Sequence, residues 1–104
     1  MSRQSPEKRV QRSIVLAAEA LGFVVSSFSQ ARASKQTAGI PDLFLTHPKH
    51  RFTCWIEVKA PGRKPTLEQK VWHQTAREAG NHVFVCDSVE SFVTEIRKEG
   101  FPCE

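Results

Sequence analysis

Asp42, Glu57 and Lys59 are the residues whose types and spacing suggest chemistry. Fourteen residues separate Asp42 from Glu57, and Lys59 follows Glu57 by two positions. Two carboxylates held side by side suit a hard divalent cation such as Mg²⁺, which acts as a Lewis acid on a phosphate and lowers the pKa of a coordinated water. The Lys59 ammonium would hold the attacking water or a phosphate oxygen and stabilise charge in the transition state. The alternative is an ordinary Glu-Lys pair on a solvated strand, with Asp42 a turn residue after Pro41.

The metal-site interpretation depends on the register of a predicted hairpin. Residues 42–47 and 52–59 have the pattern of two strands joined by a short loop at 49–50. Residues whose numbers sum to 99 then stand opposite each other, so Asp42 faces Glu57. Like charges at opposed positions, about 4.5 to 5.5 Å apart at their Cβ atoms, destabilise a sheet, and a bound cation would compensate them. On the other face the same register opposes two apolar pairs, Leu43 with Ile56 and Leu45 with Cys54.

The remaining elements surround this hairpin. Ser5 and Pro6 begin a helix that we expect over residues 6–21, and Gly22 ends it. Further patterns predict a strand at 23–28, a long loop at 29–40, a helix from the Thr66 capping box to Ala79, a strand at 82–86, and a last helix capped by Asp87 or Ser88 that reaches about Glu99. We expect the fourth strand to run parallel to the third through a right-handed crossover. The predicted fold class is α/β, an α+β mixed sheet flanked by helices in the order αβββαβα.

Length and composition limit the architecture and the partners. With 104 residues and 39% apolar content, the chain has room for one hydrophobic core, so residues 1–104 are predicted to form a single domain. Residues 1–52 carry eight basic and three acidic side chains, whereas residues 53–104 carry seven and eight. This asymmetry suits a polyanion partner, and a solvated surface that keeps the protein soluble explains it equally well. No apolar run approaches the roughly 18 residues needed to cross a bilayer.

The three cysteines, Cys54, Cys86 and Cys103, are odd in number and include no Cys-x-x-Cys pair. They predict neither a disulfide framework nor a compact zinc site. Cys54 and Cys86 lie in apolar strand-like runs and are expected to be reduced thiols of the core. We therefore expect a reducing, intracellular compartment.

The combination of motifs resembles a known group of nucleases. Gly39-Ile40-Pro41-Asp42 and Ile56-Glu57-Val58-Lys59 together are similar to the PD-(D/E)XK nuclease motif. The closer resemblance, over about residues 5–96, is to VRR-NUC domains, the virus-type replication-repair nucleases. Its further features are a Glu and a Gln four residues apart on the first helix, a Pro-Gly loop after Glu-Val-Lys, and a Gln on the next helix, here Glu7, Gln11, Pro61, Gly62 and Gln69.

The resemblance implies a set of site residues. Two metal-binding carboxylates, a backbone carbonyl ligand and a catalytic lysine of the family match Asp42, Glu57, Val58 and Lys59. The matches to Glu7 and Gln69 complete or support the site, Glu7 as a further metal ligand and Gln69 as a catalytic residue. Without the resemblance, these two residues fit structural roles equally well. Glu7 then interacts with the helix dipole, and Gln69 forms the second half of the capping box.

The expected function is that of a Mg²⁺-dependent deoxyribonuclease that hydrolyses phosphodiester bonds, with Mn²⁺ able to substitute. Because no zinc finger or separate helix-turn-helix is evident, we expect a structure-specific endonuclease for branched DNA, such as a Holliday junction or a flap, in DNA repair. Alternatives are a non-catalytic nucleic-acid-binding protein on the same fold, a sequence-specific restriction-type endonuclease and a zinc-bearing scaffold. The expected location is the cytoplasm of a bacterial or phage-infected host cell, near the nucleoid. The basic residues expected to contact DNA phosphates are Arg32, Lys35, Arg63, Lys64 and Lys70.

Three further expectations concern the surface. Paired incisions in a symmetric junction need two sites, so we expect a homodimer joined through the hairpin tip or through the last helix with Phe92, Val93 and Ile96. Trp72 is expected to pack within the protein rather than to stack on bases. His73 is expected to be a surface histidine of the second helix rather than a general base.

Overall fold

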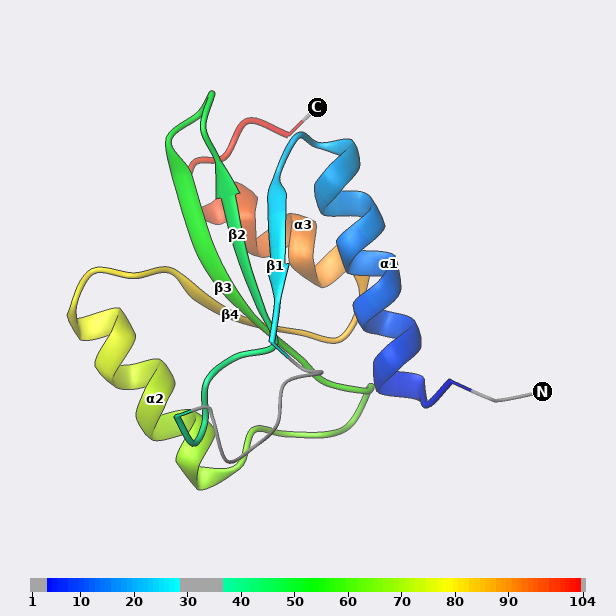
Figure 1. The fold of residues 1–104 in the computed structure, drawn as a ribbon, viewed down its shortest axis with the longest axis vertical. Helices are drawn as coiled ribbons and strands as arrows, with labels where there is room; N and C mark the ends of the chain where they lie inside the picture. The colour runs from blue at the N-terminus through cyan, green and yellow to red at the C-terminus, as the bar shows by residue number, and fades with distance from the viewer. Residues whose placement is uncertain (1–3, 29–36, 104) are drawn as a thin grey trace.

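A single four-stranded sheet organises the protein (Figure 1), whose computed structural model describes residues 4–28 and 37–103. The elements in chain order are α1 (Pro6–Ala20), β1 (Val24–Ser27), β2 (Leu43–His47), β3 (Phe52–Val58), α2 (Leu67–Glu78), β4 (Val83–Cys86) and α3 (Val89–Lys98). The predicted order of helices and strands is confirmed, and the element ends differ from the prediction by about one residue. Within the described ranges, no helix has the length and apolar character needed to cross a membrane.

The strands follow the order β1-β2-β3-β4 in a sheet of mixed orientation. β2 pairs antiparallel with both β1 and β3, whereas β4 runs parallel to β3 after the crossover through α2. In the β2-β3 pair Leu43 stands opposite Ile56, so the predicted register is confirmed. Extended by one residue before the start of β2, the same register places Asp42 opposite Glu57.

One face of the sheet is covered by α1 and α3, which pack on the strands and on each other (Figure 1). α1 contributes Ile14 and Ala18 to this core, and α3 contributes Phe92 and Ile96, all without exposed surface. The expectation that Phe92 and Ile96 form an exposed dimer surface is therefore wrong. The physical reason is that this short helix has one apolar stripe, and the sheet covers it.

Two of the three cysteines lie in the same core. Cys54 and Cys86 are buried free thiols, as expected, and Cys103 is a half-buried free thiol. Burial raises the pKa of Cys86 to about 12, so this thiol stays protonated and unreactive at neutral pH.

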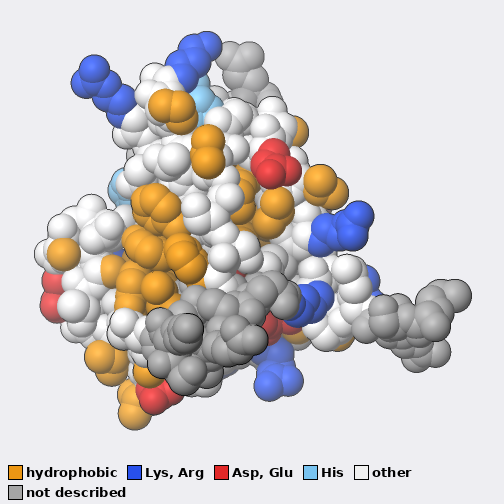
Figure 2. Space-filling view, viewed as in Figure 1, with side chains coloured by type: hydrophobic (Ala, Val, Ile, Leu, Met, Phe, Trp, Pro, Cys, Tyr) orange, Lys and Arg blue, Asp and Glu red, His pale blue; other side chains and the backbone are white. Residues whose placement is uncertain are grey.

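α2 lies against the opposite face of the sheet, over which hydrophobic side chains gather (Figure 2). Trp72 of α2 is half-buried and packs on β3, with its ring centroid 5.0 Å from that of Trp55. Phe44 of β2 adds a third ring, 4.6 Å from Trp55. Along the whole of α2, which is fully described, the buried residue is His73. The expectation that His73 lies on the surface is therefore wrong, because α2 docks through a partly polar face.

Gly39 lets the segment before β2 approach the first turn of α2. Its φ is +87°, and a Cβ at this position would collide with the backbone carbonyl of Glu68. Glycine alone among the residues satisfies both the left-handed backbone and the close approach. α2 is therefore seated against the chain that leads directly into Asp42.

Replacing Gly39 by Ala is expected to destabilise the fold and to loosen α2. The matched control is Gly62→Ala, because Gly62 has a similar φ of +85° and no described heavy atom within 4 Å of an added methyl group. The control should lose about 1 kcal/mol of the free energy of unfolding through backbone strain, and Gly39→Ala about 1 kcal/mol or more beyond that through the collision. Urea denaturation measures both losses. Equal losses would contradict the close contact between residue 39 and α2.

Candidate active site

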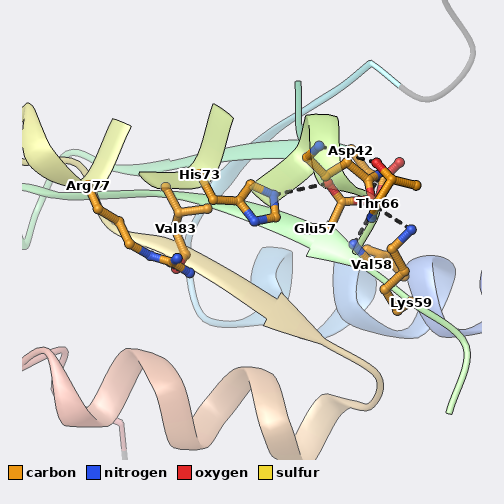
Figure 3. A network of polar contacts seen from close by, with 9 residues as sticks. Asp42, Glu57, Val58, Lys59, Thr66, His73, Arg77 and Val83 are labelled. Carbon is orange, nitrogen blue, oxygen red and sulfur yellow. Dashed lines mark hydrogen bonds and ion pairs between the residues drawn. The ribbon is translucent and has the colours of Figure 1, made fainter. Parts of the chain in front are cut away.

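Asp42, Glu57 and Lys59 come together where β2 begins and β3 ends (Figure 3). Asp42 directly precedes β2, Glu57 is the penultimate residue of β3, and Lys59 follows the last residue of that strand. The backbone N–H of Lys59 donates to the carbonyl of Cys86 at 3.0 Å and so continues the pairing with β4. Strand pairing therefore gathers at one sheet end three side chains that lie apart in the sequence.

Asp42 is held by the backbone of β3. Its Oδ2 accepts a hydrogen bond from the N–H of Val58 at 2.8 Å. The pKa of Asp42 rises to about 6, mainly because the carboxyl is buried and next because the charge of Glu57 is close, while the bond from Val58 opposes the rise. The carboxyl therefore stays beside Glu57 in spite of the repulsion between them.

Glu57 is 2% exposed and has a nitrogen partner at each carboxylate oxygen. Its Oε2 accepts from Gln69 Nε2 at 3.1 Å and lies 3.9 Å from Lys59 Nζ, while its Oε1 lies 3.3 Å from His73 Nε2. Burial raises the pKa of Glu57 to about 7, against the lowering effects of a hydrogen bond with Asp42 and of the Lys59 charge. Two carboxyls this close do not both ionise readily, so without a cation they share a proton near neutral pH.

Gln69 combines the two roles that the sequence left open. Its backbone N–H donates to Thr66 Oγ1 at 3.2 Å, and its Oε1 accepts from the Thr66 N–H at 2.8 Å, which completes a capping box. The other end of the same amide donates to Glu57. The cap thus orients the amide that contacts the carboxylate.

Glu7, in the first turn of α1, is a third carboxylate near this pair. It is half-buried, and its charge contributes to the raised pKa of Glu57. In the part of the chain that the structure describes, no three side chains of the types His, Cys, Asp and Glu are grouped as metal ligands. A cation could be held by Asp42 and Glu57 with the backbone carbonyl of Val58, and water would complete its coordination. This set of oxygen donors fits Mg²⁺, which keeps several of its waters in proteins.

His73 lies buried beside Glu57, although its sequence pattern predicts a surface residue. Its ring is 2% exposed, and burial lowers its pKa to about 4, with the charges of Arg77 and Lys59 acting in the same direction. The neutral ring therefore meets Glu57 through a hydrogen bond. The signal in the sequence was its position four residues after Gln69, which puts both side chains on one face of the helix.

Three exposed basic residues follow Lys59 along the chain. Arg63 and Lys64 lie in the connection between β3 and α2, and Lys70 lies in the first turn of α2. Arg32 and Lys35, which were predicted with them, lie outside the described residues. α1 carries further exposed arginines in its first two turns, which the sequence analysis did not single out.

Comparisons with known proteins agree with this architecture. The sequence matches the family model described as VRR-NUC domain over residues 4–90. A solved structure described as a VRR_NUC domain has a TM-score of 0.76 and 29% sequence identity, over 94% of this chain and 100% of that chain. No curated protein matches the sequence. Because the family match covers most of the chain, including every described residue of the candidate site, the chain belongs to the VRR-NUC family of nuclease domains.

Proposed function

We propose that this VRR-NUC domain is a metal-dependent endonuclease that hydrolyses phosphodiester bonds in DNA. The observation that carries the proposal is the contact between the Asp42 and Glu57 carboxyls, whose pKa values rise to about 6 and about 7. Stability alone does not favour such a pair, because each carboxyl costs free energy to bury and repels the other. A hard cation shared between them would remove the repulsion. Membership of a nuclease family supports a phosphodiester substrate.

The side chains of the site have separate tasks in this proposal. Asp42, Glu57 and the Val58 carbonyl would hold Mg²⁺, or Mn²⁺ in its place, which supplies Lewis acidity toward a phosphate oxygen and toward water. The N–H of Val58 keeps Asp42 in place, and Gln69 keeps Glu57 in place. We assign to the Lys59 ammonium the task of holding the attacking water or a phosphate oxygen and of stabilising charge in the transition state.

We further propose branched DNA as the preferred substrate and a homodimer as the active form. A symmetric junction must be cut twice, and two sites related by a two-fold axis supply both incisions. Since the apolar face of α3 is buried, the exposed hairpin tip at 48–51 is the remaining interface expected from the sequence. Arg63, Lys64 and Lys70 would contact phosphates, which report the shape of the DNA rather than its sequence.

Asp42→Asn is expected to abolish cleavage while DNA binding survives. The substitution keeps the side-chain volume and an acceptor for the Val58 N–H but removes one charge, so metal affinity falls and repulsion of the phosphate falls too. Lys59→Ala should slow cleavage by about 10²- to 10³-fold and leave metal binding largely intact, because a group aimed at developing charge typically contributes about 3 kcal/mol. The control is Lys98→Ala, which removes an exposed charge at the end of α3.

The measurement is single-turnover cleavage of a labelled branched DNA in Mg²⁺, with gel-shift affinity measured in Ca²⁺. Cleavage by Asp42→Asn at the parental rate would contradict the metal site. DNA binding by the parent chain with no cleavage in Mg²⁺ or Mn²⁺ would favour the non-catalytic binding protein. Cleavage of linear DNA at one particular sequence would favour the restriction-type enzyme.

Without metal, the carboxyl pair should make the fold less stable as the pH rises from about 4 to about 7. The ordinary pKa values, 3.8 for Asp42 and 4.5 for Glu57, lie below the folded values of about 6 and about 7. Between these limits the two carboxyls bind more protons in the folded state than in the unfolded state, so they lower the free energy of unfolding as the pH rises, while buried His73, with its pKa lowered to about 4, opposes part of this fall. Asp42→Asn should reduce this loss, because a neutral amide cannot repel ionised Glu57.

Urea denaturation in EDTA and in Mg²⁺, at about pH 4.5 and about pH 8, measures this effect. Mg²⁺ should stabilise the parent chain at the higher pH, where both carboxyls are ionised, and have little effect at the lower pH. Stabilisation by Mg²⁺ of equal size at both pH values would contradict a metal held by these carboxylates.

Replacing Arg63 and Lys64 together by Ala should weaken DNA binding and flatten its salt dependence. Each lost phosphate contact lowers the slope of log affinity against log salt by roughly one unit, for every DNA shape alike. The control is the double variant Arg97→Ala with Lys98→Ala, which removes equal charge from the last turn of α3. Fluorescence anisotropy over a salt series measures the slopes. Equal slopes for the two double variants would assign the DNA to another surface.

A further inference from the structure

His73 is a buried polar side chain that the proposed chemistry does not use as a base. Its ring is 2% exposed, and its Nε2 lies 3.3 Å from Glu57 Oε1 (Figure 3). A general base must reach the proton that it removes from a substrate or a water. The Nε2 of His73 is occupied by Glu57, and the ring does not reach the surface.

We infer that His73 is a positioning residue, which donates from Nε2 to Glu57 Oε1 and so holds this carboxylate toward Asp42. The inference rests on the proposed metal site and deepens it, because it assigns the orientation of a metal ligand to a side chain of α2. Gln69 donates to the other oxygen of Glu57 at 3.1 Å. With a donor at each oxygen, the carboxylate cannot turn freely about its last torsion.

Glu57 needs such restraint because its neighbour repels it. A glutamate has three rotatable torsions, and a rotation away from Asp42 would relieve the repulsion between the two carboxylates. A Mg²⁺ ligand must instead keep its oxygen within a near-octahedral geometry at about 2.0 to 2.1 Å from the ion. Side chains that orient a metal ligand by hydrogen bonding typically contribute about 10- to 100-fold to metal affinity or activity.

α2 is attached to the sheet by polar side chains four residues apart. Gln69 and His73 contact Glu57, and Arg77 donates from Nε and Nη2 to the carbonyl of Val83 at 3.2 and 2.7 Å. Arg77 therefore anchors the same helix to β4 without a hydrogen bond to Glu57. Loss of Arg77 should loosen α2 alone, whereas loss of His73 should also release Glu57.

The test compares His73→Leu and His73→Gln, with Arg77→Met as the control. Leu fills the space without a donor, and Gln presents an amide N–H close to the position of the histidine Nε2. Mn²⁺ binding to the DNA-free protein, followed by the electron paramagnetic resonance of the free ion, should weaken about 10- to 100-fold in His73→Leu and stay within about threefold of the parent in His73→Gln. Arg77→Met should keep the parental Mn²⁺ affinity although its urea midpoint falls.

Parental Mn²⁺ affinity in folded His73→Leu would overturn the inference. An equal loss of affinity in Arg77→Met would also overturn it, because the effect would then come from the docking of α2. If His73→Leu does not fold, His73→Asn replaces it: its amide is one methylene shorter than that of Gln and should not reach Glu57. Equal Mn²⁺ affinities of the Asn and Gln variants would then overturn the inference.

The failure of this inference is distinguishable from the failure of the proposed function. A parent chain that binds no Mn²⁺ and cleaves no branched DNA would overturn both. A parent chain that binds Mn²⁺ and cleaves, together with a His73→Leu variant that matches it in both assays, would overturn the positioning role alone.

Discussion

The close approach of the Asp42 and Glu57 carboxyls is the constraint on which this end of the molecule depends. Both groups are largely removed from water, which raises both pKa values, and each is then held in place by a donor from a different element. The backbone of β3 holds Asp42 through Val58, and α2 holds Glu57. Buried carboxyls that are hydrogen-bonded and still repel each other are typical of a binding site rather than of a core optimised for stability.

The two faces of the sheet differ accordingly in the contacts that attach their helices. On the face of α1 and α3, interlocking apolar side chains such as Ile14 and Phe92 are completely buried. On the face of α2, the contacts of the described residues include a tryptophan pair and hydrogen bonds to Glu57 and to the carbonyl of Val83. Because burial of apolar area supplies most of the favourable free energy of folding, the first face stabilises the fold and leaves the second free to hold polar chemistry.

The fold was predictable wherever local pattern and strand alternation agreed. Apolar residues alternate along β2 and β3, and the loop between the two strands is short. One register therefore buries Leu43 opposite Ile56. The same register places Asp42 opposite Glu57. A slip by one residue would have turned every one of these side chains to the other face. The element order followed from caps such as Ser5 and Thr66, whose effects are local to the chain.

The predictions for His73, Phe92 and Ile96 were wrong because the contacts of these residues are long-range and leave no local pattern in the sequence. His73 and its partner Glu57 are sixteen residues apart, and they meet only once α2 is seated beside β3. A histidine in a helix of otherwise modest apolar content has the pattern of a surface residue until that partner is known. Phe92 and Ile96 were assigned to a second copy of the chain, although the sheet of the same chain covers their stripe without the cost of association.

The seating of α2 and the ionisation of Glu57 are coupled by the same hydrogen bonds. An ionised carboxylate accepts hydrogen bonds more strongly than a protonated carboxyl, so the bonds from Gln69 and His73 are strongest when Glu57 carries its charge. A cation beside Asp42 would keep Glu57 charged, and it would thereby strengthen the attachment of α2 to the sheet. Linkage requires the converse as well: the donors of Gln69 and His73 at Glu57 favour the charged carboxylate and hence the cation, whereas the anchor of Arg77 on Val83 does not act on Glu57. In the proposed function, metal binding would therefore be coupled to the hydrogen bonds that Gln69 and His73 make with Glu57.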